Sequence, residues 1–387
     1  MSLTTRAKSR GIAIVGGGIA GLVASRVLNR HQYVCTIIEP RTELTLGGAG
    51  LVLWPAAVRA LSQLGFSDVL GLGTPLRESI LRDTKGRTLL RIPLAFSRDR
   101  QPHALTRQSL MRLLNQDQCN PILAKSCTDI SDVEHRPVLT FSDGTRMEAG
   151  GVIVAAGMNS TLRQSVSPNA QPRDCHRTSW RGVAPIEDER LAGGTGIETL
   201  GLGCRVGLFP AGNGFSYWFV QQNLHADGLI AKPSARAWLE ERLRSWPEPI
   251  ARIIAATPEE SIVETPISEM LPQPRWQRGN ALLIGDAAHG MAPDLGRGAC
   301  AAIVNLLAFD CVLSKYESFS QAAHSYVKAR RRVSWVIQHA SRLAGSLRQI
   351  ENRFLYTVRN TLWRFLPPLL LFRLIVPLLT KRLKKRS

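Results

Sequence analysis

Residues 16–21 of this chain read GGGIAG and directly follow a four-residue apolar run, Ile12–Val15. A buried strand that turns sharply needs a residue without a side chain at the turn, and Gly16 suits that position. Gly18 would let the backbone approach a bound pyrophosphate, and Gly21 would let the following helix pack closely on the strand. The pattern therefore predicts a Rossmann-like βαβ unit built on a parallel sheet.

The residues after the glycines complete this unit. Residues 22–29 are mostly good helix formers with an apolar face, and residues 34–38 form a second apolar run that ends at Glu39. The N-terminus of the helix, where Ala20 lies, would offer amide N–H groups and a favourable dipole to a doubly charged pyrophosphate. Glu39 comes 18 residues after Gly21, where a carboxylate accepts hydrogen bonds from ribose hydroxyls. We therefore expect a nucleotide to bind here.

A second segment, far downstream, carries the motifs LLIGDAAH and PDLGRG. Residues 280–284 predict a buried strand, which puts Asp286 at its carboxyl end, within reach of the ribityl chain of a flavin. Gly296 and Gly298 would let a helix over residues 299–312 press its N-terminal N–H groups against the flavin pyrimidine ring, where its dipole stabilises negative charge. The two segments together indicate FAD rather than NAD as the resident nucleotide.

At this point the chain resembles a known family, the FAD-dependent aromatic hydroxylases of the p-hydroxybenzoate and salicylate hydroxylase group. The resemblance covers roughly residues 11–340 and rests on GGGIAGL with Glu39, on LTRQSL with Arg107, and on RGNALLIGDAAHGMAPDLGRG. A Trp-Pro pair after GGAG (residues 47–50) and the pair Tyr217-Trp218 also fit. Members bind FAD, take a hydride from NAD(P)H, react with O2 and transfer one oxygen atom to a substrate. The resemblance implies that the following residues bind the cofactor: Gly16, Gly18, Ala20, Gly21, Glu39, Arg41, Gly50, Arg107, Asp286, Pro293, Gly296, Gly298 and Ala299.

Two departures from the family pattern bear on the chemistry. The segment over residues 154–163 reads VAAGMNSTLR and has Ala156 where the family usually has an aspartate that helps to hold FAD and NAD(P)H. Arg297 stands where glutamine is common, and Val304-Asn305 stands where an acidic pair is common. A guanidinium at position 297 would favour an anionic reduced flavin if it lies beside the ring, and would do nothing if it points to solvent.

Length and composition suit an α/β fold with more than one domain. We expect a Rossmann-like FAD-binding domain of the glutathione-reductase type, discontinuous over residues 1–165 and 275–345, with residues 76–99 shared with the substrate domain. A mixed β-sheet domain that binds the substrate should lie over residues 166–274. Residues 346–387 form a basic, apolar and helical C-terminal tail.

Within the inserted domain, residues 205–210 and 215–220 predict a pair of strands, and residues 211–214 supply the turn between them. Residues 235–246 predict a surface helix. In the family the flavin ring sits between the FAD-binding domain and such a sheet. The protein then mainly positions the substrate and excludes water.

Arg181 and Tyr217 are the candidate catalytic residues on this sheet. Arg181 could hold a phenolate or carbonyl oxygen, and Tyr217 could exchange a proton with it. Each also has an ordinary structural explanation. Arg181 could be a surface arginine without a catalytic role, and Tyr217 could be a strand tyrosine whose hydroxyl is hydrogen-bonded within the protein. His289 is expected to shape the turn after Asp286, and His103 is expected to be a loop histidine.

The C-terminal tail concentrates positive charge. The net charge is +19, and from Ser318 to the end there are 15 Lys or Arg against one acid, Glu351, which gives +14. Apolar runs at residues 365–372 and 374–379 are interrupted by prolines and an arginine, so a spanning helix is not expected. A monotopic membrane anchor through residues 353–387 and a helix packed on its own domain are both open, and the terminal basic cluster favours the anchor. No aromatic platform or groove-reading motif accompanies the cluster, so no nucleic-acid partner is expected.

Seven cysteines show no metal-binding spacing, so we predict no metal site and reduced thiols in a cytoplasmic protein. Residues 1–10 are polar and basic, without the apolar core of a signal peptide.

Two function classes follow. One is an FAD-dependent monooxygenase that uses NAD(P)H and O2 to hydroxylate or epoxidise a lipophilic aromatic, prenylated or polyene substrate in secondary metabolism. The other has the same architecture without oxygenation, as an isoprenoid reductase or a redox-neutral cyclase, which Ala156 slightly favours. A flavin-dependent halogenase is disfavoured because the Trp-x-Trp-x-Ile-Pro pattern is absent.

Overall fold

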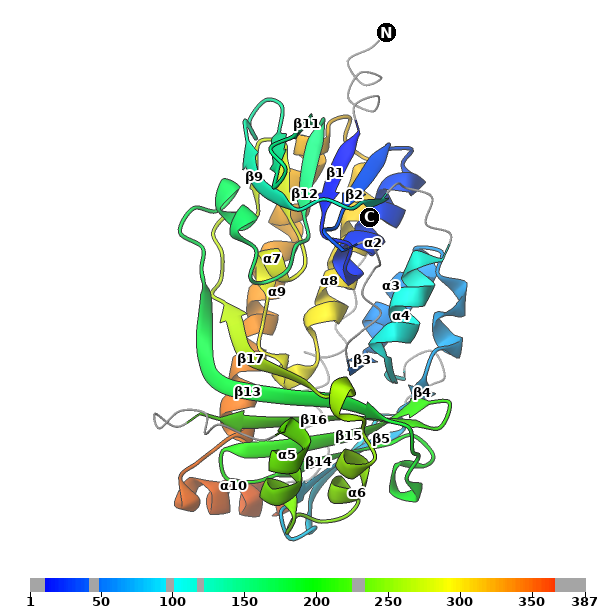
Figure 1. Ribbon diagram of the computed structural model, residues 1–387, viewed down its shortest axis with the longest axis vertical. Helices are drawn as coiled ribbons and strands as arrows, with labels where there is room; N and C mark the ends of the chain where they lie inside the picture. The colour runs from blue at the N-terminus through cyan, green and yellow to red at the C-terminus, as the bar shows by residue number, and fades with distance from the viewer. Residues whose placement is uncertain (1–10, 42–48, 95–100, 117–121, 225–233, 366–387) are drawn as a thin grey trace.

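The computed structural model describes residues 11–41, 49–94, 101–116, 122–224 and 234–365. It has two large sheets, one in the upper and one in the lower half of Figure 1, with long helices running beside and between them. Gly47 and Gly48 of the GGAG segment lie outside the described residues, as does the tail from residue 366 onward.

The upper sheet has six strands in the order β18-β19-β12-β1-β2-β8. All neighbours are parallel except β18 and β19, which run antiparallel. The apolar run before the glycines is the central strand, and the predicted strand and helix positions of both motifs are confirmed. The strand bounds are β1 (Ile12–Val15), β2 (Cys35–Ile38), β8 (Ile122–Leu123), β12 (Gly151–Val154), β18 (Gln277–Arg278) and β19 (Ala281–Leu283).

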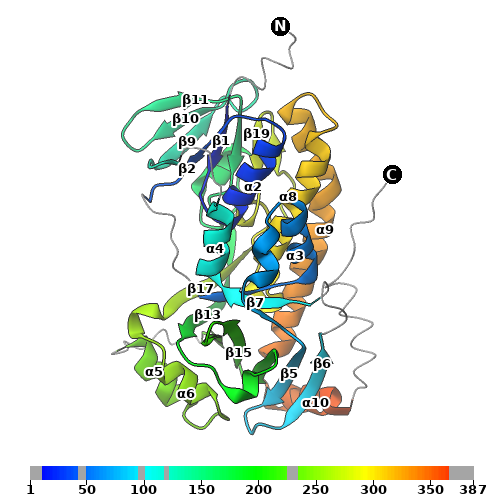
Figure 2. The same ribbon diagram turned by 90° about the vertical axis from the view of Figure 1, so that its right-hand side faces the viewer.

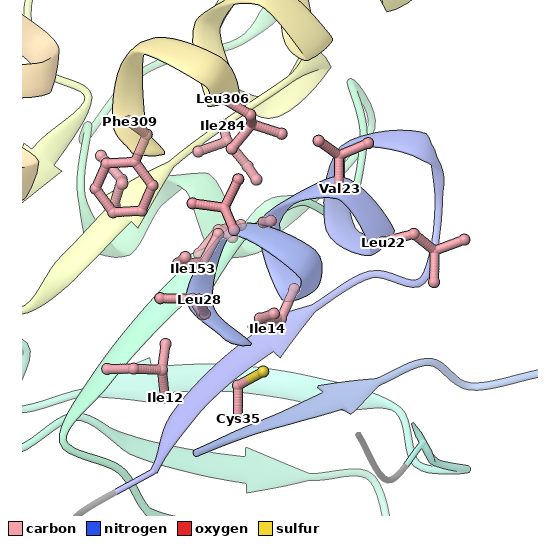
Figure 3. Close-up of a cluster of buried hydrophobic side chains, with 14 of the residues drawn as sticks. Ile12, Ile14, Leu22, Val23, Leu28, Cys35, Ile153, Ile284, Leu306 and Phe309 are labelled. Atoms are coloured by element: carbon pink, nitrogen blue, oxygen red, sulfur yellow. The ribbon is translucent and has the colours of Figure 1, made fainter. Parts of the chain in front are cut away.

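Helices from both ends of the chain pack on this sheet. These are α2 (Ile19–Arg30) and α8 (Gly298–Leu313), which lie side by side, with α9 (Phe319–Arg348) against α8. Figure 3 shows how one core joins β1, α2 and α8, through Ile14, Leu22, Leu28, Leu306 and Phe309. Each of these fully buried side chains contributes about 1.5–3 kcal/mol through removal of apolar surface from water. The early and late motifs are therefore held together by packing.

The lower sheet has seven strands in the order β17-β13-β16-β15-β14-β5-β6. It is mixed, because β5 and β14 are parallel while the other neighbours are antiparallel. The strands are β5 (Glu78–Asp83), β6 (Thr88–Pro93), β13 (Pro172–Ala184), β14 (Thr195–Leu200), β15 (Cys204–Gly212), β16 (Phe215–Asn223) and β17 (Val263–Met270).

The predicted hairpin in this sheet is present, but its turn is shorter than expected. Only Asn213 and Gly214 lie outside the strands, instead of residues 211–214. Both have positive φ values, 54° and 79°, which is the conformation of a two-residue turn that matches the twist of the flanking strands. The predicted surface helix also ends early: α5 covers Ala235–Leu243.

The two faces of the lower sheet have different neighbours because side chains alternate along each strand. Along β16, Trp218 and Val220 face a core formed with α5 and α6 (Ile250–Ala255), which Figure 1 shows against the sheet. Tyr217, Phe219 and Gln221 face the opposite way, toward the upper half of the molecule.

Smaller elements connect and extend the two large sheets. One three-stranded sheet, β3-β7-β4, contacts β15 and β16 of the lower sheet, and the other is β11-β10-β9. Their bounds, with the two helices that follow β3 and β7, are β3 (Gly50–Leu53), β4 (Thr74–Pro75), β7 (His103–Thr106), β9 (Cys127–Ser131), β10 (Val138–Phe141), β11 (Arg146–Glu148), α3 (Pro55–Gln63) and α4 (Arg107–Asn115).

The described part of the chain ends with α9 and α10 (Arg353–Phe365). Figure 2 shows α9 spanning both halves and α10 beside β5 and β6. Among the described helices, none combines the length and apolarity needed to cross a membrane.

Candidate functional site

The glycine turn after β1 has the geometry that the motif predicts. Gly16 has φ +111°, and a Cβ there would lie 2.6 Å from the carbonyl oxygen of Ala155. A Cβ on Gly21 would lie 1.9 Å from the carbonyl oxygen of Gly16. A Cβ on Gly18 would meet no atom within 4 Å, so this residue faces open space at the N-terminus of α2. That space is where a pyrophosphate can approach the backbone.

Glu39 lies directly behind this turn. Its Oε2 accepts a hydrogen bond from the amide of Gly17 at 2.9 Å, so the carboxylate at the end of β2 is tied to the turn at the end of β1. This contact places an acid at the edge of the open space, as a ribose-binding carboxylate requires.

The second motif meets the first at the N-terminus of α2. Gly285 has φ +58°, and a Cβ there would lie 2.8 Å from the side chain of Ala20. Asp286 begins the short helix α7 (Asp286–His289), and a Cβ on Gly298 would lie 3.7 Å from its carboxylate. Asp286 therefore lies between the N-termini of two helices, α2 and α8, where helix dipoles favour negative groups.

The charge state of Asp286 is influenced by burial and by Arg107. Its carboxylate is open to the cavity described below but is enclosed by protein elsewhere. Burial raises the pKa of Asp286, and Arg107 opposes this by favouring the charged form. Burial lowers the pKa of Arg107, Asp286 raises it, and Arg41 lowers it. Arg107 and Asp286 are therefore close enough for each to favour the charged form of the other.

Arg163, from the segment in which Ala156 departs from the family pattern, supports α7 from below. It is buried, and its guanidinium donates to the carbonyl oxygen of Ala287 at 3.0 Å and to that of Met158. The middle segment therefore anchors α7, the helix that begins with Asp286, although it lacks the usual acid.

A cavity of about 640 Å³ lies between this end of the site and the lower sheet. The residues assigned to the flavin end line it: Gly50, Asp286, Pro293, Gly296, Gly298 and Ala299. Trp54 lines it too, and its Nε1 is buried without a hydrogen-bond partner among the described residues. A buried donor of this kind fits an acceptor on a bound group. The residues present therefore fit FAD, with the adenine side at Glu39 and the ring side at Asp286.

The substrate side of the cavity is mostly apolar and aromatic. Its walls include Leu51, Val52, Leu76, Ile92, Leu94, Phe209 and Phe219. Polar side chains gather on the sheet, namely Ser79, Arg181, Glu198, Gln221 and Thr265.

Both candidate catalytic residues line this cavity. Arg181 donates to Ser179 Oγ at 3.1 Å and to Thr265 Oγ1 at 3.3 Å, so it is fixed along β13. Tyr217 packs near the ring of Phe209, with centroids 6.0 Å apart. Burial raises the pKa of Tyr217, and Arg181 lowers it, so the two side chains are close enough to interact.

A buried network of charged groups beside the cavity was not anticipated from the sequence. Asp294, next to Pro293, accepts two hydrogen bonds from Arg177 at 2.9 and 3.0 Å and one from Arg205 at 2.9 Å. Arg205 is also bonded to Gln221 Oε1, at 3.0 and 2.7 Å, and lies 3.4 Å from Glu198. The available signal in the sequence was Arg205, a charged residue in an otherwise apolar strand. Its partner could not be inferred, because Asp294 is 89 residues from Arg205 and 117 residues from Arg177 along the chain.

One other expectation is corrected, and one alternative that the sequence left open is decided. His103 is not a loop histidine: it lies on β7, is only 4% exposed, and burial lowers its pKa. Arg297 does not point to solvent, because it is buried at the start of α8. The GDAAH histidine, His289, is fully buried and shares a hydrogen bond of 2.9 Å between its Nε2 and Asn305.

His289 should make the protein sensitive to acid. Burial lowers its pKa to about 4, with a smaller contribution from Arg330, while in the unfolded chain it titrates near 6.5. The unfolded state therefore binds the proton first, so this contribution to stability is complete above pH 6.5 and is lost between pH 6.5 and 4. The loss is about 3 kcal/mol. Urea unfolding across this range should show a flatter pH dependence for His289→Asn than for the wild type.

The exposed His135 provides the control. His135→Asn should keep the wild-type pH dependence, and an equally steep curve for His289→Asn would refute the assignment.

Comparison with known proteins identifies the family. The FAD binding domain family model matches residues 10–341, so the chain belongs to this family. It is 29% identical to an aurachin C monooxygenase/isomerase of Stigmatella aurantiaca, over 92% of this chain and 94% of that protein. It is also 29% identical to the 2-heptyl-3-hydroxy-4(1H)-quinolone synthase of Pseudomonas aeruginosa, over the same shares. Among solved structures, Klebsiella pneumoniae HpxO complexed with FAD and uric acid matches with a TM-score of 0.87 and 26% identity, over 96% of this chain and 97% of that one.

The family and the site agree on the cofactor and on the class of enzyme. The chain is an FAD-dependent monooxygenase of the aromatic-hydroxylase type, and FAD is its cofactor. FAD accepts a hydride and activates O2, and the protein supplies the binding, orientation and electrostatics for that chemistry.

Proposed function

We propose that this enzyme hydroxylates or epoxidises a lipophilic aromatic small molecule of secondary metabolism, with NAD(P)H and O2 as co-substrates. One oxygen atom enters the substrate and the other leaves as water, while NAD(P)H supplies two electrons. The single observation that carries the proposal is the cavity, whose aromatic and aliphatic walls meet a polar group of side chains on the sheet.

The shape of the cavity favours an aromatic head group with an apolar chain. A volume of about 640 Å³ is in the range of sites that enclose most of a drug-sized ligand. Leu76, Ile92 and Leu94 supply apolar surface for a chain, while Arg181 supplies a cation for a ring oxygen. The name of the Pseudomonas relative specifies a quinolone with a heptyl chain, which is a molecule of this type.

The proposed roles of the site residues follow from their surroundings. Arg181 would hold the substrate oxygen, because its guanidinium is fixed by Ser179 and Thr265 and lines the cavity. Tyr217 would remain a neutral phenol at physiological pH, because burial raises its pKa. It can therefore donate a hydrogen bond or exchange a proton with that oxygen. Glu39, Arg41, Arg107 and Asp286 would hold FAD.

The test is turnover of the flavin-loaded enzyme with 2-heptyl-4(1H)-quinolone and with 4(1H)-quinolone, which lacks the chain. We expect the alkylated compound to stimulate NAD(P)H oxidation and O2 uptake together and to give a product heavier by one oxygen atom. Loss of chain burial should raise the KM of the unsubstituted compound by about 100-fold or more, since each buried CH2 contributes about 0.8 kcal/mol.

The alternative class predicts a different result. An isoprenoid reductase or redox-neutral cyclase would convert its substrate without O2 uptake. Product formation under strict anaerobiosis would therefore overturn the oxygenase proposal.

We place the enzyme in the cytoplasm, in peripheral contact with a membrane through residues 353–387.

A further inference from the structure

Helix α10 is oriented with its apolar side outward. The side chains that face the protein include Arg359 and Asn360, which are 4% and 9% exposed. The opposite side carries five exposed apolar side chains, which are Phe354 (74%), Leu355 (52%), Val358 (37%), Leu362 (55%) and Phe365 (79%). Phe354 and Leu355 lie four and three residues before Val358, and Leu362 and Phe365 follow at intervals of four and three, so all five fall in one stripe. A helix that packs only on its own domain would have the reverse arrangement.

The polar side of α10 is firmly attached, so rotation of the helix would not bury the stripe. Arg359 Nη1 donates to the carbonyl oxygens of Leu347 and Arg348, both at 3.0 Å, at the end of α9. The hydroxyl of Tyr356 donates to the carbonyl oxygen of Leu200 at 3.2 Å. The two bonds from Arg359 cap orphan carbonyl groups at the end of α9. Together with the bond from Tyr356, they set the direction in which the apolar stripe faces.

The second half of α9 exposes apolar side chains as well. Val336 (55%), Leu343 (63%) and Leu347 (44%) are seven and four residues apart, which places them along one side of that helix. We call the exposed stripe of α10 the C-terminal apolar face.

The charges around this face select its partner. Exposed Arg332, Arg353 and Arg364 lie on the same two helices, and Glu351 is the only acid from Ser318 to the end of the chain. Glu351 already accepts a hydrogen bond from Asn223 at 2.8 Å. A second copy of the chain on this face would bring like charges together, which is unfavourable. The segment after Phe365 is also basic, with no acid to pair with these arginines.

We propose that the C-terminal apolar face docks on an anionic phospholipid surface. Phe354, Leu362 and Phe365 enter the acyl boundary, and Arg353 and Arg364 bind headgroup phosphates. Helix α10 packs on β6, whose Ile92 lines the cavity, so docking brings the substrate site close to the membrane. The docking does not depend on which substrate is turned over.

The experiment is sedimentation of the full-length, FAD-loaded chain with phosphatidylcholine vesicles, with and without one third phosphatidylglycerol. We expect binding to the anionic vesicles that weakens about tenfold or more in the triple variant Phe354→Ser, Leu362→Ser, Phe365→Ser. The matched control, Val34→Ser, Leu70→Ser, Leu271→Ser, removes three exposed apolar side chains elsewhere and should bind like the wild type. Raising NaCl from about 0.1 to about 0.5 M should weaken binding, because salt screens the headgroup contacts.

Three results would overturn the proposal. One is that the triple variant binds the vesicles as well as the wild type does. This includes the case in which only deletion of residues 366–387 abolishes binding. Another is binding that does not respond to phosphatidylglycerol. The third combines two observations on the wild type: it does not bind vesicles, and it forms a dimer in sedimentation equilibrium that the triple substitution dissociates. The flavin absorbance of each variant reports folding, and turnover in solution tests the proposed function separately.

Discussion

Asp294→Asn should destabilise the protein by about 3–5 kcal/mol, because it removes the negative charge between the buried Arg205 and the largely buried Arg177. The Asp294 carboxylate is fully buried, and the side chains of Arg177 and Arg205 are 12% and 1% exposed. Burial lowers the pKa of Arg205, and Asp294 opposes this. Without the carboxylate, Arg205 keeps Gln221 and the more distant Glu198 as its polar partners among the residues that the structure describes.

The effect should extend to turnover, because Asp294 joins the two halves of the molecule. It lies in the one-turn 3-10 helix Pro293–Leu295, it binds strands β13 and β15 through the two arginines, and its backbone oxygen accepts from Arg348 of α9. Pro293 and Asp294 both line the cavity. Weakening the contacts of Asp294 with β13, β15 and α9 should lower the fraction of NAD(P)H oxidation that yields oxygenated product. Urea unfolding and a product-to-NAD(P)H ratio measure the two effects.

Asp310→Asn is the matched control for this substitution. The Asp310 carboxylate also lies 3.1 Å from two basic side chains, Arg30 and His31, but these partners are 43% and 20% exposed. Partly exposed pairs contribute about 0–1 kcal/mol, so this variant should stay close to the wild type. Equal destabilisation by the two substitutions would show that the buried network has no special role.

The elements that the sequence predicted are those specified by local patterns. The strand, glycine turn and helix of residues 12–30 are encoded within one short segment, where apolar runs and glycines have a direct steric meaning. The hairpin of β15 and β16 follows from two apolar runs with Asn-Gly between them, and the error in its turn length concerned only the ends of the strands. The FAD assignment needed both motifs, which the fold brings together at Ala20 and Gly285.

The features that could not be predicted depend on contacts between distant segments. Nothing near Arg205 in the sequence indicates that Asp294 neutralises it. His103 follows a proline and suggested a loop, yet the backbone pairs with both β3 and β4 and buries it. The sequence indicated a basic, apolar and helical tail, but which side of α10 faces the protein is decided by the carbonyl groups of α9 that Arg359 reaches.

Gly18→Ala and Gly21→Ala should affect different properties of the protein, because Gly21→Ala should impair folding while Gly18→Ala should impair FAD binding. A Cβ at residue 21 would lie 1.9 Å from the carbonyl oxygen of Gly16, and that residue is held by a 2.8 Å hydrogen bond from its amide to Ile38. Because backbone cannot move aside cheaply, Gly21→Ala should cost about 3 kcal/mol or more in the protein without cofactor. Gly18 has φ −76° and ψ −172°, which alanine adopts without strain, and its Cβ would meet nothing. Gly18→Ala should therefore fold normally.

The same open space makes Gly18 sensitive to the cofactor. A methyl group there occupies the volume that a pyrophosphate needs, so Gly18→Ala should weaken FAD binding by about tenfold or more, as expected for the loss of one or two hydrogen bonds to a charged group. Gly71→Ala is the neutral control, because its Cβ would also meet nothing and it lies away from the motif. Urea unfolding of the flavin-free proteins and titration of each with FAD measure the two quantities. If Gly18→Ala bound FAD as tightly as the wild type, the pyrophosphate would not lie at this turn.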